Sequence, residues 1–238
     1  MKLLIGNKNY SSWSMRPWVL LTQFDIPFEE VMARFDSFEG DSTFKATVRA
    51  LSPAGKVPIL VEDDGFSVWD TLAIAEYLAE KFPAKALWPR DARHRARARS
   101  VCSEMHSGFG ALRNAFPMNI EASLPEVGAR VLGEDAAARA DLARMIELWQ
   151  QALAESGGPW LFGEYSIADA FFAPVVMRMR AYGLPVPADV AAYNERAAAA
   201  KGTAAWIRDA LAEKDFVPFD EPYRTSRTES LVANELNL

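Results

Sequence analysis

The first 82 residues alternate between strand-like and helix-like segments, and this alternation constrains the fold more than any other feature. Short apolar runs are expected to form strands, and longer runs with apolar residues at helical spacing are expected to form helices. The expected strands are KLLIG (2–6), FEEVMA (28–33), Pro58–Val61 and Phe66–Val68, and the expected helices are RPWVLLTQF (16–24), STFKATVRAL (42–51) and TLAIAEYLAEKF (71–82). The order βαβαββα predicts a small mixed sheet with helices packed on it.

Turn and cap residues support these boundaries. Pro17 is expected in the first turn of its helix, where a missing N–H costs nothing. Asp41 or Ser42 is expected to cap the second helix, and Asp70 the third. The Asp–Asp–Gly sequence at 63–65 predicts a hairpin turn between the last two strands.

From Asp91 onward the chain is rich in alanine, leucine and arginine, and shows no convincing strand. Helices are expected at about 91–116, 135–155, 166–182, 188–200 and 203–213. Ser166 and Asp169 have the spacing of a capping box before an apolar run. We therefore predict two domains, residues 1–82 and 91–238, joined by a linker at 83–90 that Pro83 and Pro89 bracket. The tail beyond Asp215 contains prolines and polar residues, which favours a surface extension.

Composition excludes several classes of function. A net charge of −6 argues against a general nucleic-acid binder, and the arginine-rich stretch at 90–99 is expected to be a solvated or dimer-facing helix. The single cysteine, Cys102, cannot form a disulfide within the chain and is expected to be buried. His94 and His106 do not share a helix face, so no metal site is expected. No apolar run is long enough for a signal peptide or a membrane span, which favours the cytoplasm.

Three stretches resemble the glutathione transferase family in the order and spacing that this family shows. They are SPAGKVPIL (52–60), WDTLAIAEYLAEKFP (69–83) and LFGEYSIADAFFAPV (161–175), and the resemblance runs from about residue 3 to residue 212. It implies a thioredoxin-like N-terminal βαβαββα domain followed by an all-helical C-terminal domain, in a homodimer. It also implies glutathione as co-substrate, without a metal.

A fourth stretch, SSWSMR (11–16), resembles the S-S-C-x-W-R motif of the serine-type, zeta-like transferases. The resemblance implies that Ser11 activates the glutathione thiol, with Ser12 as the next candidate. A hydroxyl that donates a hydrogen bond to a thiolate at a helix N-terminus lowers the pKa of the thiol by roughly one to two units. Ser14 lies further into the helix and is more typical of a cap. Another branch of the family uses a tyrosine at the end of the first strand, but Tyr10 directly abuts the serine motif and is therefore less favoured.

The remaining site residues are also expected from the resemblance. Glutathione is expected to contact Lys56, Val57, Pro58, Asp70 and Thr71, with the Val57–Pro58 peptide bond cis. The second-substrate pocket is expected to contain Trp13, Met105, Phe109 and Arg113. For Met105 and Phe109, core packing explains the spacing equally well. Trp13 stands where zeta-like enzymes have cysteine, which puts maleylacetoacetate isomerase activity in doubt.

The expected function is attack by a glutathione thiolate on a small hydrophobic electrophile. Conjugation, isomerisation and peroxide reduction all begin with this thiolate, so they remain open alternatives. A glutathione-fold binding or regulatory protein without turnover is the alternative from a different class.

Overall fold

The computed structural model describes residues 1–229 of the chain. Four strands, β1 (Lys2–Ile5), β2 (Glu29–Met32), β3 (Ile59–Val61) and β4 (Ser67–Trp69), form one sheet in the order β2-β1-β3-β4. β1 pairs parallel with β2 and antiparallel with β3, and β3 pairs antiparallel with β4. The mixed thioredoxin-like sheet that the sequence predicts is thus confirmed.

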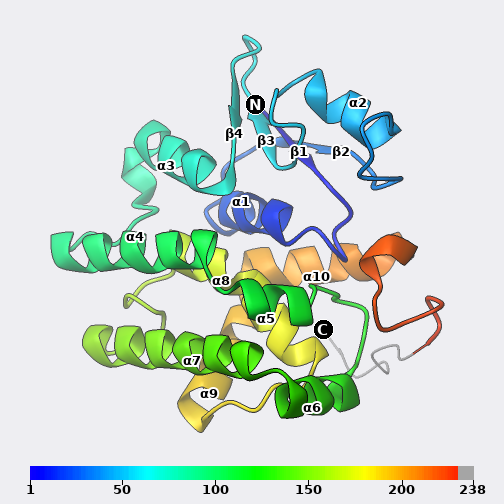
Figure 1. Cartoon of the computed structure of the whole chain (residues 1–238). Helices are drawn as coiled ribbons and strands as arrows, with labels where there is room; N and C mark the ends of the chain where they lie inside the picture. Colours follow the sequence, from blue (N-terminus) through cyan, green and yellow to red (C-terminus); the bar gives the residue numbers. More distant parts are fainter. Residues whose placement is uncertain (230–238) are drawn as a thin grey trace.

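Helices cover both faces of this sheet (Figure 1). They are α1 (Ser12–Gln23), α2 (Thr43–Arg49) and α3 (Thr71–Lys81). Because successive strand residues face opposite sides, Leu3 and Ile5 pack in the large core that contains α1 and α3, whereas Leu4 packs with Phe44 and Val48 of α2. The structure also confirms two predicted N-caps: Ser42 caps α2, and the Asp70 carboxylate caps α3.

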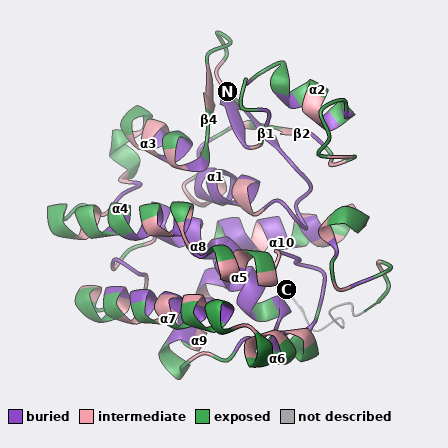
Figure 2. Ribbon diagram, viewed as in Figure 1, coloured by how far each residue is buried: buried purple, intermediate pink, exposed green. Residues whose placement is uncertain are grey.

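The rest of the described chain is helical, as expected. Its helices are α4 (Ala92–Ser107), α5 (Gly110–Ala115), α6 (Pro125–Glu134), α7 (Ala136–Ser156), α8 (Ile167–Ala181), α9 (Ala188–Ala199) and α10 (Lys201–Glu213), with short 3₁₀ turns η1 (Pro83–Lys85) and η2 (Pro218–Asp220). Helix α8 is buried along almost its whole length, as Figure 2 shows. The predicted capping box is present at its start. The Asp169 carboxylate accepts a hydrogen bond from the Ser166 N–H, and the Ser166 hydroxyl accepts one from a backbone N–H of the first turn. None of the helices within residues 1–229 combines the length and the apolar character needed to cross a bilayer.

Helix α1 joins the two halves of the molecule. It lies between the sheet and the helical half, where it contacts both α8 and α10. The contact with α10 is close because Gly202 has no side chain: a Cβ there would lie 2.3 Å from the carbonyl oxygen of Val19. Helix α1 is therefore packed closely against α10 at Val19.

Three details differ from the sequence predictions. The expected helix at 91–116 is broken at Gly108–Phe109 into α4 and α5, and Phe109 takes a left-handed conformation with φ +57°. Helix α6 was not expected. Helix α1 begins at Ser12, so Pro17 lies in the second turn and its predicted place in the first turn is wrong.

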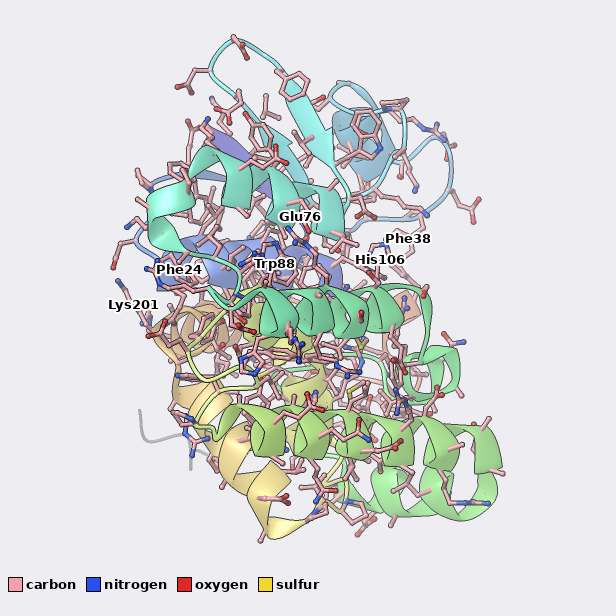
Figure 3. All side chains as sticks on the ribbon, turned by 90° about the vertical axis from the view of Figure 1, so that its left-hand side faces the viewer. Phe24, Phe38, Glu76, Trp88, His106 and Lys201 are labelled. Atoms are coloured by element: carbon pink, nitrogen blue, oxygen red, sulfur yellow. The ribbon has the colours of Figure 1, made fainter. Side chains whose placement is uncertain are left out.

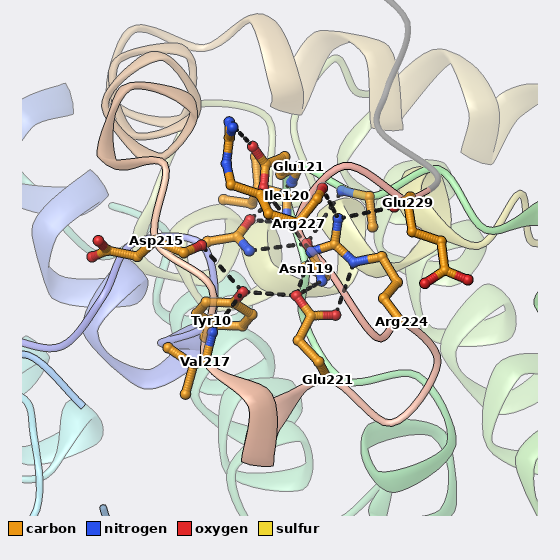
Figure 4. Close-up of polar contacts among 12 residues, drawn as sticks. Tyr10, Asn119, Ile120, Glu121, Asp215, Val217, Glu221, Arg224, Arg227 and Glu229 are labelled. Atoms are coloured by element: carbon orange, nitrogen blue, oxygen red, sulfur yellow. Dashed lines mark hydrogen bonds and ion pairs between the residues drawn. The ribbon is translucent and has the colours of Figure 1, made fainter. Parts of the chain in front are cut away.

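The predicted surface extension beyond Asp215 is also wrong for the residues that the structure describes. Glu221 and Arg224 are buried and form an ion pair, with Arg224 Nε 2.9 Å from Glu221 Oε2. Arg227 pairs with Glu121, at the other side of the same cluster (Figure 4). A buried ion pair needs further hydrogen bonds to offset its desolvation, and Asn119 donates one to Glu221 at 2.8 Å. The tail thus packs into the protein.

Candidate active site

The junction between β1 and α1 holds three serine hydroxyls. Ser11 occupies the N-cap position of α1, but its side chain does not accept a hydrogen bond from the helix. Instead, Ser11 Oγ donates to Ser14 Oγ at 2.7 Å, and Ser14 Oγ accepts from the Gly6 N–H at 3.1 Å. Ser14 is fully buried behind Ser11. The backbone of Gly6 therefore fixes Ser14, and Ser14 fixes the hydroxyl of Ser11.

Ser11 and Ser12 both line a cavity of about 370 Å³ between the two halves of the protein, and Ser14 does not. The oxygen of Ser12 accepts a hydrogen bond from Arg178 of α8 at 3.4 Å. Both hydroxyls lie at the N-terminus of α1, where the positive end of the helix dipole favours an anion. Either serine can therefore donate to a thiolate in this cavity.

Tyr10 also lines this cavity, but its hydroxyl is already engaged by the tail. It donates to Glu221 Oε1 at 2.7 Å and accepts from the Val217 N–H at 3.3 Å (Figure 4). Burial and the neighbouring Glu221 carboxylate raise the pKa of Tyr10 well above its usual value. These contacts give Tyr10 a role in anchoring the tail.

A second cavity of about 510 Å³ adjoins the first and shares Trp13, Lys56, Val57 and Arg113 with it. Its other lining residues include Pro58, Asp70 and Thr71, so the structure brings together all five residues expected to bind glutathione. The Val57–Pro58 peptide bond is cis, as expected. The hydroxyl of Thr71 is buried and has no hydrogen-bond partner within residues 1–229. A buried polar atom without a partner fits a site that a polar ligand completes.

Asp70 is held from both halves of the protein. Its Oδ1 accepts from the Leu72 N–H at 2.8 Å at the start of α3, and its Oδ2 lies 3.2 Å from His106 Nε2 of α4. Figure 3 shows His106 on α4, on the side of the helix that faces the N-terminal half. His106 was not expected in the site, because the sequence separates it widely from Asp70. The Asp70 carboxylate nevertheless lies at the cavity wall, where it can receive an ammonium group.

Trp13 lines both cavities, and two arginines contact its ring. The guanidinium carbon of Arg16 lies 4.2 Å from the centroid of its ring, and that of Arg113 lies 4.8 Å from it. His106 packs against the same ring edge-to-face at 5.2 Å. These cation–π contacts fix the indole at the wall.

Met105 and Phe109 lie elsewhere. Both are buried in the main hydrophobic core, and neither is among the residues that line the two cavities within residues 1–229. The break at Gly108 turns the chain before α5, so Arg113 reaches the cavity while Phe109 does not. Of the four residues expected to form the second-substrate pocket, the structure brings only Trp13 and Arg113 to the cavity wall.

Several cavity residues were missed by sequence reasoning. Arg178 is an arginine in the middle of the apolar run that forms the core helix α8, and this position could have been noticed. Asp220 comes from the tail, and burial raises the pKa of its carboxyl group to about 6. Phe35, Phe38 and Phe44 pack on one another and line the cavity of Ser11, and no local pattern marks them as site residues.

The fold and this pair of cavities define a glutathione-transferase-like protein, and comparison with known families agrees. A model of the glutathione S-transferase N-terminal domain matches residues 10–81, and one of the C-terminal domain matches residues 94–209. The chain therefore belongs to the glutathione S-transferase family.

The sequence identity to individual relatives is low. Maleylacetoacetate isomerase of Pseudomonas aeruginosa is 29% identical over 79% of this chain and 85% of its own. Glutathione S-transferase hmp2 of Hypomyces subiculosus is 30% identical over 71% of this chain and 79% of its own. Among solved structures, a glutathione transferase homolog from Burkholderia with bound glutathione is 26% identical, with a TM-score of 0.65 over 89% of this chain and 98% of that one.

Proposed function

We propose that the protein activates the thiol of glutathione for attack on a small, largely hydrophobic electrophile. The observation that supports this most directly is the pair of adjoining cavities. One contains the unpartnered Thr71 hydroxyl and the Asp70 carboxylate, and the other contains the Ser11 hydroxyl at the N-terminus of α1. The tripeptide occupies the Thr71 cavity and presents its sulfur to Ser11.

The chemistry needs no general base. A thiol with a pKa near 8.5 is about 3% ionised at pH 7, and one hydrogen bond to the thiolate raises this fraction roughly tenfold or more. Ser14 can donate to Ser11 when the thiolate forms, because a hydrogen bond between two hydroxyls can run in either direction. Ser11 then donates its own proton toward the sulfur. The positive end of α1 and the guanidinium of Arg178 add to the stabilisation of the thiolate.

The proposal is tested with glutathione and a panel of electrophiles that includes an aryl chloride, a hydroperoxide and a cis-enone. We expect glutathione to raise the melting temperature and the aryl chloride to give a thioether product. Thr71→Val replaces the unpartnered hydroxyl by a methyl group of similar size. It is expected to raise KM for glutathione about three- to tenfold with little change in kcat. If glutathione leaves the melting temperature unchanged and no electrophile reacts, the proposal is wrong.

Tyr10→Phe provides a matched test of the other hydroxyl at this junction. We expect kcat/KM to stay within about twofold, because Tyr10 bonds to the tail. The free energy of unfolding should fall by about 1–2 kcal/mol, since Glu221 and the Val217 N–H each lose a partner. Steady-state kinetics and urea denaturation measure the two quantities. A fall in kcat/KM of about 100-fold would instead show that Tyr10 activates the glutathione thiol.

A further inference from the structure

The turn between β1 and the serine motif is built from buried polar residues. Asn7, Lys8, Asn9 and Tyr10 precede Ser11, and all four are buried. The Tyr10 N–H and the Ser11 N–H both donate to the carbonyl oxygen of Asn7, at 3.1 Å and 2.8 Å. These two hydrogen bonds close the turn, so a shift of Asn9 also shifts Ser11.

Asn9 uses both ends of its side-chain amide in contacts with the segment between α5 and α6. Its Oδ1 accepts hydrogen bonds from the Ile120 N–H and the Glu121 N–H, each at 2.8 Å. Its Nδ2 donates to Asn119 Oδ1 at 3.0 Å. Two backbone donors require an oxygen opposite them, so these contacts fix which end of the amide is which. The side chain at this position must therefore accept and donate at once.

The segment that Asn9 holds forms part of the cavity wall. Pro117 and Met118 come directly before Asn119 and line the cavity that contains Ser11. Asn9 therefore connects the turn that carries the Ser11 hydroxyl to a wall supplied by the helical half. Asn9 itself is not among the residues that line the two cavities within 1–229.

The far side of Asn119 is held as well. Its Nδ2 donates to Glu221 Oε1 at 2.8 Å, and the Tyr10 hydroxyl donates to the same oxygen at 2.7 Å (Figure 4). The contacts from Asn9 to Asn119, to Glu221 and back to Tyr10 form a closed ring, because Asn9 and Tyr10 are neighbours in the chain. All four side chains are buried. A buried polar network whose members are all satisfied favours a single arrangement.

We propose that Asn9 is a positioning residue that sets where the Ser11 hydroxyl lies in the cavity. Gly6 and Ser14 hold that hydroxyl from within the N-terminal half, and Asn9 ties it to the helical half. This inference rests on the proposed function and deepens it, because it names a residue that acts on the thiol only through Ser11. Catalysis is sensitive to such placement, since a displacement of about 1 Å by a distant mutation can lower a rate on the order of 100-fold.

Asn9→Asp tests the donor end of this amide without changing its size. The carboxylate still accepts from the two backbone N–H groups, but its second oxygen faces Asn119 Oδ1 and repels it. We expect kcat to fall about 5- to 20-fold and the pKa of the bound thiol to rise by about one-half to one unit. KM for glutathione should change less than about twofold, since Asn9 lies outside both cavities. Steady-state kinetics and the absorbance of the bound thiolate against pH measure these quantities.

A double variant separates positioning from a merely structural role. If Asn9 acts through Ser11, its effect disappears when that hydroxyl is absent. In the Ser11→Ala background, Asn9→Asp should therefore change kcat and the pKa of the bound thiol by less than about twofold and 0.3 units. An equal loss of rate in both backgrounds would overturn the inference.

Tyr223→Phe is the matched control for general destabilisation. The Tyr223 hydroxyl donates to the Ala115 carbonyl oxygen at 2.8 Å, so this variant loosens the tail but leaves the contacts of Asn9 intact. We expect its melting temperature to fall by about 2–4 °C while kcat stays within about twofold. A loss of kcat in Tyr223→Phe as large as that in Asn9→Asp would show that loosening the tail is sufficient, and would also overturn the inference.

Asn119→Ala provides the second variant if Asn9→Asp does not fold, because Asn9 Oδ1 then keeps both backbone donors. Its loss of kcat should likewise be present with Ser11 and absent in Ser11→Ala. Wild-type turnover that neither Asn9→Asp nor Asn119→Ala reduces would overturn the inference and leave the transferase proposal intact. A wild-type protein that neither binds glutathione nor turns over any electrophile would overturn the transferase proposal, and the inference with it.

Discussion

Ser11→Ala is expected to lower kcat/KM for glutathione conjugation about 10- to 100-fold while leaving the fold intact. The hydroxyl lines the cavity and makes no capping hydrogen bond to α1, so its removal costs little stability. A hydrogen bond to a charged group contributes about 1.5–3 kcal/mol, which corresponds to this range of rates. The direct measurement is the absorbance of the bound thiolate near 240 nm against pH, which should show a pKa about one to two units higher in the variant.

The neighbouring serines provide the controls. Ser12→Ala should have a smaller effect than Ser11→Ala if Ser11 is the donor, and a larger one if the hydroxyl beside Arg178 has that role. Ser14→Ala breaks the connection from Gly6 to Ser11 without touching the cavity, so a loss of about three- to tenfold is expected. An unchanged thiolate titration in Ser11→Ala would remove Ser11 from the mechanism.

Asp169→Ala is expected to lower the free energy of unfolding by about 3–5 kcal/mol, the largest effect on stability that we predict. Its carboxylate accepts hydrogen bonds from the Leu161 N–H at 3.2 Å, the Ser166 N–H at 2.9 Å and the Tyr193 hydroxyl at 3.1 Å. All three donors are buried, come from the loop before α8, its N-cap and α9, and would lose their partner together. Urea denaturation at constant pH measures the change in midpoint.

Asp169→Asn is the milder control, since its amide keeps one acceptor oxygen, and an intermediate loss is expected. Burial raises the pKa of Asp169 to about 6 in the folded protein, above its ordinary value. Folding therefore favours the protonated form, and this contribution to stability is present at acidic pH and lost as the pH rises through 6. The Asn variant should lack this part of the pH dependence. A loss below about 1 kcal/mol in Asp169→Ala would show that water replaces the carboxylate.

The regular elements could largely be predicted because their signals are local. The four strands and the capping residues Ser42, Asp70 and Ser166 follow from neighbouring residues alone. Helix α6 escaped prediction because it contains Gly128 and Gly133, and glycine disfavours a helix. The structure explains Gly128, because a Cβ there would lie 1.9 Å from the carbonyl oxygen of Tyr182. Tertiary packing therefore requires a glycine at this position.

The candidate site was only partly visible for a related reason. Ser11, Val57 and Thr71 belong to local motifs, and the structure places all three at the cavities. Arg178 meets Ser12 across 166 residues of chain, and such a pairing leaves no periodic trace in a single sequence. The sequence could not decide where Met105 lies, because the helical spacing of apolar residues is the same whether a helix faces the core or a cavity.

The buried tail has a consequence for how the protein is made. Tyr10 is hydrogen-bonded to Glu221, 211 residues later in the chain (Figure 4). This contact helps to hold the junction between β1 and α1, which contains Ser11. During synthesis the N-terminal domain leaves the ribosome long before its partner residues exist, and chains emerge at roughly 5–20 residues per second. The junction therefore waits on the order of ten seconds for its final contacts. A nascent chain can form the sheet early, but the contacts around its Ser11 cavity are completed only after Glu221 has emerged.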